Sequence, residues 1–432
     1  MYLKRLFTLP ILLLAASCGR NNPDGPGNNP IDITSPEPTE QITKVSLNET
    51  QRGYVKAGNK MAFRMLIELY DGQDLIFSPL SLQYALAMTA NGAEGETLQE
   101  IIDFLGYGLE GIAALNEYSK TMLEQLPAVD LDVTLKLTDA MLVNENFPLL
   151  PAFKNKVQGN YYAAVENMSF VNPQKVANHI NEWAKGNTNG FIDKLIEAKE
   201  ISPLAAAFLM NALYFKAKWA GSNHNPMFLE GATTEESFTK TGGSVKKVKM
   251  MRNMRYHGYA EMDGFKVLAL PYAGGKFFMY VLLPDKNDLG GLLKKLQDTP
   301  WSTVTSSFKH DAEVYVKLPK FDIEEKYNLN ESLQNLGIKK AFKANLAEFD
   351  SMFDVKGYNF NIDKVIQKAR ISVAEWGTEA AAVTVVEMAP TSAGPGGLEP
   401  KRVYFYADHP FAFVIGEASS GAILFEGVFT GE

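Results

Sequence analysis

The chain has 432 residues, of which 46% are hydrophobic and 21% charged, and its formal net charge is −8. This composition supports a large buried core. The negative balance gives no overall attraction to nucleic acid, so no nucleic-acid partner is expected. Cys18 is the only cysteine, which excludes a disulfide within the chain.

The N-terminus is predicted to be an export signal over residues 1–17, because Lys4 and Arg5 precede an apolar run from Leu9 to Ala16. The segment that ends at Cys18 resembles the lipobox of bacterial lipoproteins, in which the cysteine is acylated after cleavage. This resemblance implies an exported lipoprotein, anchored through Cys18 to the outer membrane or the cell surface. With an ordinary signal peptide the chain would be secreted instead.

Residues 18–45 are predicted to be a flexible tether, because they are rich in Asn, Pro and Gly and have almost no apolar spacing. Beyond Cys18 no apolar stretch reaches the roughly 20 residues that a membrane span needs. No linker-like composition interrupts the chain between residues 46 and 390. Residues 46–432 are therefore predicted to form a single domain.

Within this domain, apolar spacing predicts helices and strands in the following order. The first half holds a helix at 50–70, a strand at 75–79, helices at 80–91 and 94–105, strands at 131–143 and 163–170, a helix at 176–186 and a strand at 205–219. The second half holds strands at 245–251, 255–262, 267–272 and 277–283, a helix at 289–297, a strand at 313–318, a helix at 329–336, and strands at 367–374, 403–406, 411–416 and 422–428.

Two incompatible patterns meet near the end of the chain. The stretch from Gly377 to Glu387 is rich in strand formers, whereas residues 389–400 contain three prolines and three glycines and are predicted to be an exposed loop. Side chains alternate between the two faces of a strand. One face would hold Thr378, Ala380, Ala382, Thr384 and Val386, and the other Glu379, Ala381, Val383, Val385 and Glu387. The first face is small and uncharged enough to be buried in a sheet.

Several short motifs also occur in order along the chain. They are Phe77-Ser78-Pro79-Leu80-Ser81, Ile180-Asn181-Glu182-Trp183, Thr188-Asn189-Gly190-Phe191-Ile192, Asn211-Ala212-Leu213-Tyr214-Phe215-Lys216-Ala217-Lys218-Trp219, Leu318-Pro319-Lys320-Phe321, Leu336-Gly337-Ile338, Ala407-Asp408-His409-Pro410-Phe411 and Leu424-Phe425-Glu426-Gly427. Together they resemble the serpin family of protease inhibitors over about residues 46–430. The resemblance implies an α+β fold with three β-sheets, eight or nine helices and an exposed reactive-centre loop at about residues 375–402.

The same resemblance implies a suicide-substrate inhibitor of serine proteases. The protease would cleave the loop as an acyl-enzyme, and the cleaved loop would insert as a central strand before deacylation, leaving a covalent 1:1 complex. The family's spacing from Gly377 places the reactive bond at Thr391–Ser392. About 15 residues at roughly 3.3 Å each would span about 50 Å, enough to carry a protease across the domain. The implied hinge residues are Glu375, Gly377, Thr378, Glu379, Ala380, Ala381 and Ala382.

Thr391 at the primary specificity position predicts elastase-like or subtilisin-like targets, because a small side chain suits a shallow apolar pocket. No Lys or Arg lies between Ala374 and Glu399, which disfavours trypsin-like targets. The long loop leaves a broader range open, with cysteine proteases included. The other residues of this segment, offered as specificity positions or as alternative bonds, are Val386, Met388, Ala389 and Pro390.

The resemblance places the opening of the central sheet at Ser78, Ser81, Asn211, Trp219 and Gln367. Trp219 is expected near the top of this sheet, where it would pack in the core and also gate insertion. Gln367 stands where the family usually has a histidine, so a different hydrogen-bond network is expected there. The segment after Trp219 and the loop before residue 407 are both longer than is usual.

Other classes of function find little support in the chain. It contains no HExxH pair, no G-x-S-x-G serine and no phosphate-binding G-x-x-x-x-G-K-[ST], so neither an enzyme nor a cofactor or metal site is expected. The serious alternative is a serpin-fold binding protein that does not inhibit. Such members tend to carry charged, bulky or proline residues on the inserting face, and none occurs here. A monomeric inhibitor is the favoured interpretation.

Overall fold

Several helices of the molecule begin at a polar N-cap residue that the sequence supplies. The computed structural model describes residues 38, 40–108, 111–221, 225–355, 358–378 and 401–432. Helix α1 (Glu49–Leu69) begins with a capping box in which Asn48 and Gln51 exchange backbone and side-chain hydrogen bonds. Helix α2 (Pro79–Ala90) follows Ser78, and α6 (Pro173–Asn187) follows Asn172; both have a capping side chain and a proline in the first turn.

The described residues contain nine α-helices and three β-sheets, as the resemblance implied. The remaining helices are α3 (Gly95–Leu105), α4 (Gly111–Gln125), α5 (Pro151–Tyr161), α7 (Leu289–Asp298), α8 (Trp301–Ser306) and α9 (Asn330–Asn335). Asp32–Glu432 forms one compact unit by its contacts. No helix in the described ranges combines the length and the apolarity that crossing a bilayer requires.

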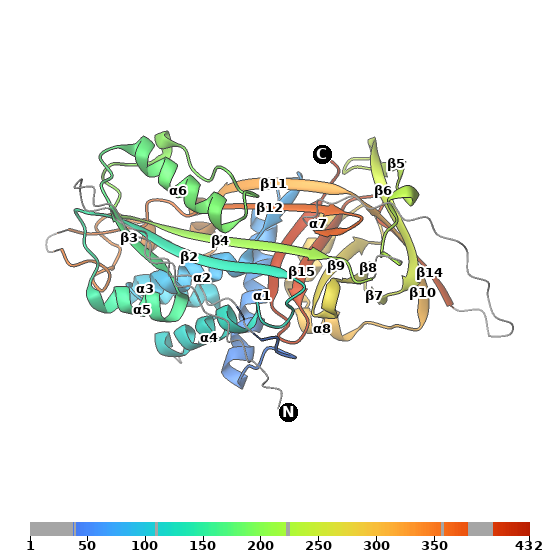
Figure 1. Cartoon of the computed structure of the whole chain (residues 1–432), viewed down its shortest axis with the longest axis horizontal. Coiled ribbons are helices and arrows are strands. Elements are labelled where there is room, and N and C mark those ends of the chain that lie inside the picture. Colours follow the sequence, from blue (N-terminus) through green and yellow to red (C-terminus); the bar gives the residue numbers. More distant parts are fainter. Residues whose placement is uncertain (1–37, 39, 109–110, 222–224, 356–357, 379–400) are drawn as a thin grey trace, which may run out of the picture. The chain divides into compact units, whose positions relative to one another are not determined.

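The first sheet, which we call the central sheet, has six strands and runs along the long axis of Figure 1. In spatial order its strands are β11 (Phe321–Asn328), β12 (Ile366–Ala374), β13 (Gly377–Thr378), β4 (Ala207–Lys218), β2 (Thr134–Asn144) and β3 (Ala164–Met168). Within the described residues, strand β13 comprises Gly377 and Thr378. Its place between β12 and β4 positions the candidate site.

Two further sheets complete the fold. The core sheet runs in the order β1 (Leu75–Phe77), β16 (Ile423–Phe429), β15 (Phe411–Glu417), β9 (Phe277–Pro284), β8 (Phe265–Pro271) and β7 (Gly258–Met262). The small sheet runs in the order β14 (Lys401–Tyr406), β10 (Ala312–Pro319), β6 (Val245–Tyr256) and β5 (Thr234–Thr239). Figure 1 shows the small sheet at the right-hand end of the molecule.

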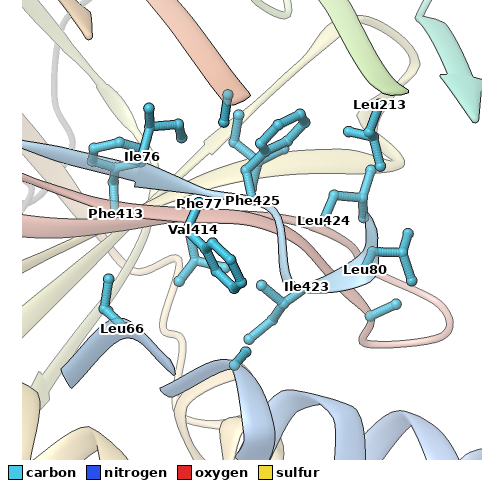
Figure 2. Packing of buried hydrophobic residues seen from close by; sticks show 14 of the residues in the cluster. Leu66, Ile76, Phe77, Leu80, Leu213, Phe413, Val414, Ile423, Leu424 and Phe425 are labelled. Atoms are coloured by element: carbon cyan, nitrogen blue, oxygen red, sulfur yellow. The ribbon is translucent and has the colours of Figure 1, made fainter. Parts of the chain in front are cut away.

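The main core joins helices to two of the sheets. Helix α2 is buried along its whole length except at Ala85, because it lies between β4 and β16. Figure 2 shows apolar side chains of α1, α2, β1, β4, β15 and β16 meeting at this point. Burying this much apolar surface is the main driving force for the fold.

The structure corrects some sequence predictions. The prediction that one strand ends at residue 251 and another begins at 255 is wrong, because β6 runs without a break from Val245 to Tyr256. Helices α4, α5 and α8 and strands β5 and β11 were not predicted. Strand β2 begins at Thr134 rather than Leu131, since residues 131 and 132 form a turn. Turn and propensity signals are weak at these places, and long-range packing decides the outcome.

Glu426 is an unusual member of the core. It lies on β16, opposite Phe77 of β1 and Val414 of β15, and it is fully buried. Neither carboxyl oxygen has a hydrogen-bond partner among the described residues. Burial raises the pKa of Glu426 well above its ordinary value, since the charged form is penalised in an apolar environment.

We expect Glu426→Gln to become more stable relative to the wild type as the pH rises. A folded-state pKa above the unfolded value means that the wild type loses stability as the pH climbs from the unfolded pKa toward the folded one. Over that interval the loss in the free energy of unfolding is about 1.4 kcal/mol per pH unit. Melting temperatures of both proteins between about pH 5 and about pH 8 test this. A difference that stays constant over this range would contradict the assignment.

Candidate functional site

The candidate site begins where β13 enters the central sheet. Gly377 lies between Ala374 of β12 and Lys218 of β4, and Thr378 lies between Val373 and Ala217; both pairings are antiparallel. Among the described residues, no hydrogen-bonded register joins β12 directly to β4. Two residues of the predicted hinge therefore occupy a strand position in the sheet.

Gly377 is required by the geometry of this entry. Its φ is +145°, a conformation that residues with a side chain rarely adopt. A Cβ atom placed there would lie 2.0 Å from the carbonyl oxygen of Ala217, so the neighbouring strand leaves no room for it. The glycine allows the chain to turn from β12 into close contact with β4.

Thr378, which the alternation assigned to the inward face, has a buried side chain with 3% exposure. Its Oγ1 lies 2.5 Å from the hydroxyl oxygen of Tyr272, the residue that follows β8. Burial raises the pKa of Tyr272, which keeps its hydroxyl protonated and able to donate. The hinge therefore carries a specific polar contact inside the protein before any cleavage.

Trp219 holds the turn that leads into β13. Its indole Nε1 donates to the Ala374 carbonyl at 2.8 Å, and its backbone N–H donates to the Trp376 carbonyl at 3.0 Å. Its ring stacks on Tyr272 with centroids 4.6 Å apart and an angle of 6° between the planes. An edge contact with Phe228 completes the packing. The residue thus contributes both to the core and to the fastening of the hinge.

Glu375 is a buried carboxylate with two partners. Lys320 Nζ lies 2.7 Å from one oxygen, and the Thr233 hydroxyl donates to the other at 2.7 Å. Burial alone would raise the pKa of Glu375, but the hydrogen bonds from Lys320 and Thr233 outweigh this and hold it below its usual range. The start of the hinge is therefore tied to the residue before β5 and to the junction of β10 and β11.

Gln367 forms a second cluster, near the start of β12. Its Oε1 accepts from the Ser78 N–H, and its Nε2 donates to the Ser78 carbonyl, both at 2.9 Å. The Ser78 hydroxyl contacts Ser81 Oγ at 3.0 Å and donates to the Leu424 carbonyl at 2.9 Å. A glutamine at this position thus links β12 to the start of α2 and to the core sheet.

Asn211 lies near this cluster and bonds elsewhere. Its Nδ2 donates to Asp139 of β2 at 2.7 Å. Burial raises the pKa of Asp139 to about 7, and the bond from Asn211 lowers it in part. A cavity of about 50 Å³ lies here between β4 and β12. Its walls include Asn211 of β4, Gln367 of β12 and Ser81 of α2. The structure therefore brings together Ser78, Ser81 and Gln367, with Asn211 across a small cavity.

Residues 188–200, which follow α6, contact β4 on one side of β13 and β12 and β11 on the other. The Phe191 ring lies 6.2 Å from that of Tyr214 on β4 and 4.7 Å from the Arg370 guanidinium on β12. Glu200 pairs with Lys326 of β11 at 2.8 Å. This segment therefore contacts the strands on both sides of the hinge.

Several contributors were not identified from sequence. Lys320 was noted only within a motif, and Tyr272, Thr233 and Asp139 were not singled out, because nothing in their local sequence shows that they meet Glu375, Thr378 or Asn211. The predicted residues that lie outside the described residues are Cys18, Glu379, Ala380, Ala381, Ala382, Val386, Met388, Ala389, Pro390, Thr391 and Ser392. In the described ranges no cluster of three or more His, Cys, Asp or Glu is arranged to hold a metal ion.

We expect Lys320→Met to destabilise the protein by on the order of 2 kcal/mol at neutral pH, because Glu375 would lose its charged partner. Since the folded-state pKa of Glu375 is lowered, its contribution is present above the unfolded value of about 4.3 and is lost as the pH falls through the folded value. The deficit in melting temperature should therefore shrink below about pH 4. The double variant Lys320→Met, Glu375→Gln should recover part of the loss at neutral pH. A deficit that the double variant keeps in full would exclude the ion pair as its source.

Comparison with known proteins places this arrangement in a family. Residues 56–431 match the family model described as serpin (serine protease inhibitor). An uncharacterised serpin-like protein of Thermococcus kodakarensis is 31% identical over 98% of this chain and 97% of its own length. Serpin B8 of Homo sapiens is 33% identical over 85% of the chain and 96% of its own length. The native crystal structure of the thermophilic serpin tengpin, 28% identical, superposes with a TM-score of 0.80 over 91% of this chain and 97% of that one. The chain belongs to the serpin family.

Proposed function

We propose that this chain is a suicide-substrate inhibitor of serine proteases. The observation that carries the proposal is the position of Gly377 and Thr378, paired on both sides within the central sheet. Residues 380, 382, 384 and 386 continue the inward face that Thr378 begins, and all are small or β-branched and uncharged. A cut loop could therefore extend β13 without burying a charge on that face.

The proposed mechanism uses the loop bond Thr391–Ser392. The protease serine attacks the Thr391 carbonyl, the amine of Ser392 leaves with a proton, and an ester links the protease to Thr391. Residues 379–391 then extend β13 between β12 and β4 and carry the attached protease along the sheet. Strand β4 has 12 residues and spans about 40 Å, which suits an inserted strand of this length. Displacement distorts the protease's catalytic centre before water can release it.

Thr391 supports elastase-like or subtilisin-like targets, and cysteine proteases remain within the proposal because they also form acyl-enzymes. The partner is one protease per chain, held covalently, and the inhibitor acts as a monomer. We further propose that residues 1–17 are an export signal and that Cys18 carries lipid. Residues 18–45 would tether residues 46–432 to an outer membrane or cell surface.

The direct test mixes the purified full chain with pancreatic elastase and with subtilisin. We expect an SDS-resistant band enlarged by about the mass of one protease, together with a released fragment that begins at Ser392. Mass spectrometry of this fragment identifies the bond. Cleavage with no adduct for any protease tested would favour a serpin-fold binding protein that does not inhibit.

Ala382→Arg and Ala381→Arg form a matched pair on opposite faces of the strand that would insert. Ala382→Arg would bury an unpaired charge at a cost of several kcal/mol, so most of the chain should be cleaved as a substrate. The number of inhibitor molecules consumed per trapped protease should rise by at least about tenfold, since about 1.4 kcal/mol corresponds to that factor. Ala381→Arg should change it little. Equal behaviour of the two variants would contradict the insertion mechanism.

A further inference from the structure

One face of the small sheet exposes large apolar side chains in register. Tyr315 of β10 lies opposite Met254 of β6 on one side and opposite Tyr404 of β14 on the other. Met254 and Tyr404 are 51% and 54% exposed, and Tyr256, two residues along β6 from Met254, is 59% exposed. Tyr406, two residues along β14 from Tyr404, lies on the same face. We call Met254, Tyr256, Tyr315, Tyr404 and Tyr406 the tyrosine face.

The rings of this face support one another. The Tyr315 and Tyr404 centroids are 5.1 Å apart, and those of Tyr404 and Tyr406 are 5.7 Å apart. Lys317 Nζ lies 4.7 Å from the centre of the Tyr406 ring. Side chains held in place by their neighbours lose little freedom when a partner covers them, which lowers the cost of binding.

On the β5 side, the charges beside the tyrosine face are paired within the protein. Glu236 of β5 accepts from Arg252 at 2.5 Å and from Lys317 at 2.7 Å. Glu313 of β10 lies opposite Tyr256 of β6 on one side and opposite Arg402 of β14 on the other. A partner would therefore meet an aromatic surface with hydroxyl groups, bordered on the β5 side by charges that already have partners within the protein. Tyrosine, methionine and arginine are the residue types enriched in protein interfaces.

The position of this face in the chain indicates its partner. Residues 379–400 lie outside the described structure, and they rejoin it at Lys401, the first residue of β14. Ser392 is nine residues before Lys401 (401 − 392 = 9), so the proposed bond can lie no farther than about 30 Å from the start of β14. A protease of roughly 230 residues is about 45 Å across. Figure 1 shows β14, β10 and β6 side by side at this end of the molecule.

We propose that the tyrosine face is a second docking surface for the target protease, contacted while the loop occupies the protease's active site. This inference rests on the proposed inhibitory function and adds a determinant of target choice. The partner surface is the rim of the protease's substrate cleft, with aliphatic side chains to cover Met254 and Tyr404 and hydrogen-bonding groups for the tyrosine hydroxyls. The face would speed formation of the encounter complex and would leave loop insertion unaffected.

The test compares the double variant Met254→Ser, Tyr404→Ser with the wild type and with Tyr358→Ser, a control of similar exposure that lies outside the tyrosine face. The protease used is whichever of pancreatic elastase and subtilisin reacts faster with the wild-type chain. We expect the second-order rate constant of inhibition to fall at least about tenfold in the double variant and to stay unchanged in the control. The number of inhibitor molecules consumed per trapped protease should not change. The affinity for the same protease with its catalytic serine replaced by alanine should fall by the same factor.

The outcomes separate this inference from the function on which it rests. Adduct formation with equal rates for all three proteins overturns the docking surface and leaves the inhibitory function intact. Absence of an adduct with the wild type overturns both. A wild-type dimer in sedimentation that the double variant lacks, with equal inhibition rates, would assign the face to a second copy of the chain and overturn the protease assignment. Because the substituted side chains are exposed, melting temperatures close to the wild type should accompany any loss of rate.

Discussion

The close approach of Gly377 to β4 is the constraint on which the rest of the site depends. Only a residue without a Cβ atom can bring the chain within reach of the Ala217 carbonyl, and this turn places Thr378 between β12 and β4. Trp219 donates to Ala374 before the turn, Tyr272 contacts Thr378 after it, and Lys320 pairs with Glu375 within it. These contacts stabilise the turn. Gly377 and Thr378 thereby lie between β12 and β4, as the first two residues of a strand that the following sequence is patterned to continue.

The contacts along this sheet fall into two classes. At the end of the sheet where β13 enters, the contacts are buried and involve the hinge residues Glu375 and Thr378. Near the start of β12, Gln367 binds Ser78, and across a small cavity Asn211 of β4 donates to Asp139 of β2. Asn211 Oδ1 and Asp139 Oδ2 are buried there without a hydrogen-bond partner among the described residues. Among the described residues no backbone pairing joins β12 directly to β4, so a strand entering between them would gain backbone hydrogen bonds on both sides. This arrangement accounts for how one sequence could support insertion.

Much of the fold could be predicted from sequence, because apolar spacing and turn residues mark most helices and strands directly, as in α1 and β9. The missed elements, such as β11, have mixed polarity and owe their structure to long-range pairing with β12. At the site, Gly377 and the alternation after it were visible in the sequence. Lys320, Thr233 and Tyr272 were not, since their roles come from contacts between distant parts of the chain, which no local pattern encodes. Gln367 shows a related limit. The sequence showed a glutamine where the family usually has a histidine, but it did not show that the amide would bind both the N–H and the carbonyl of Ser78.

If the central sheet gains a strand when the loop is cut, the cut chain should be more resistant to thermal denaturation than the intact chain. The full chain would be cut once within residues 379–400 by a metalloprotease, which forms no acyl-enzyme and therefore leaves the cut chain without a partner. We expect the cut chain to melt at least about 10 °C higher than the intact chain, because an inserted strand adds hydrogen bonds and buried surface. A cut chain that melts at the same temperature as the intact chain, or lower, would contradict strand insertion.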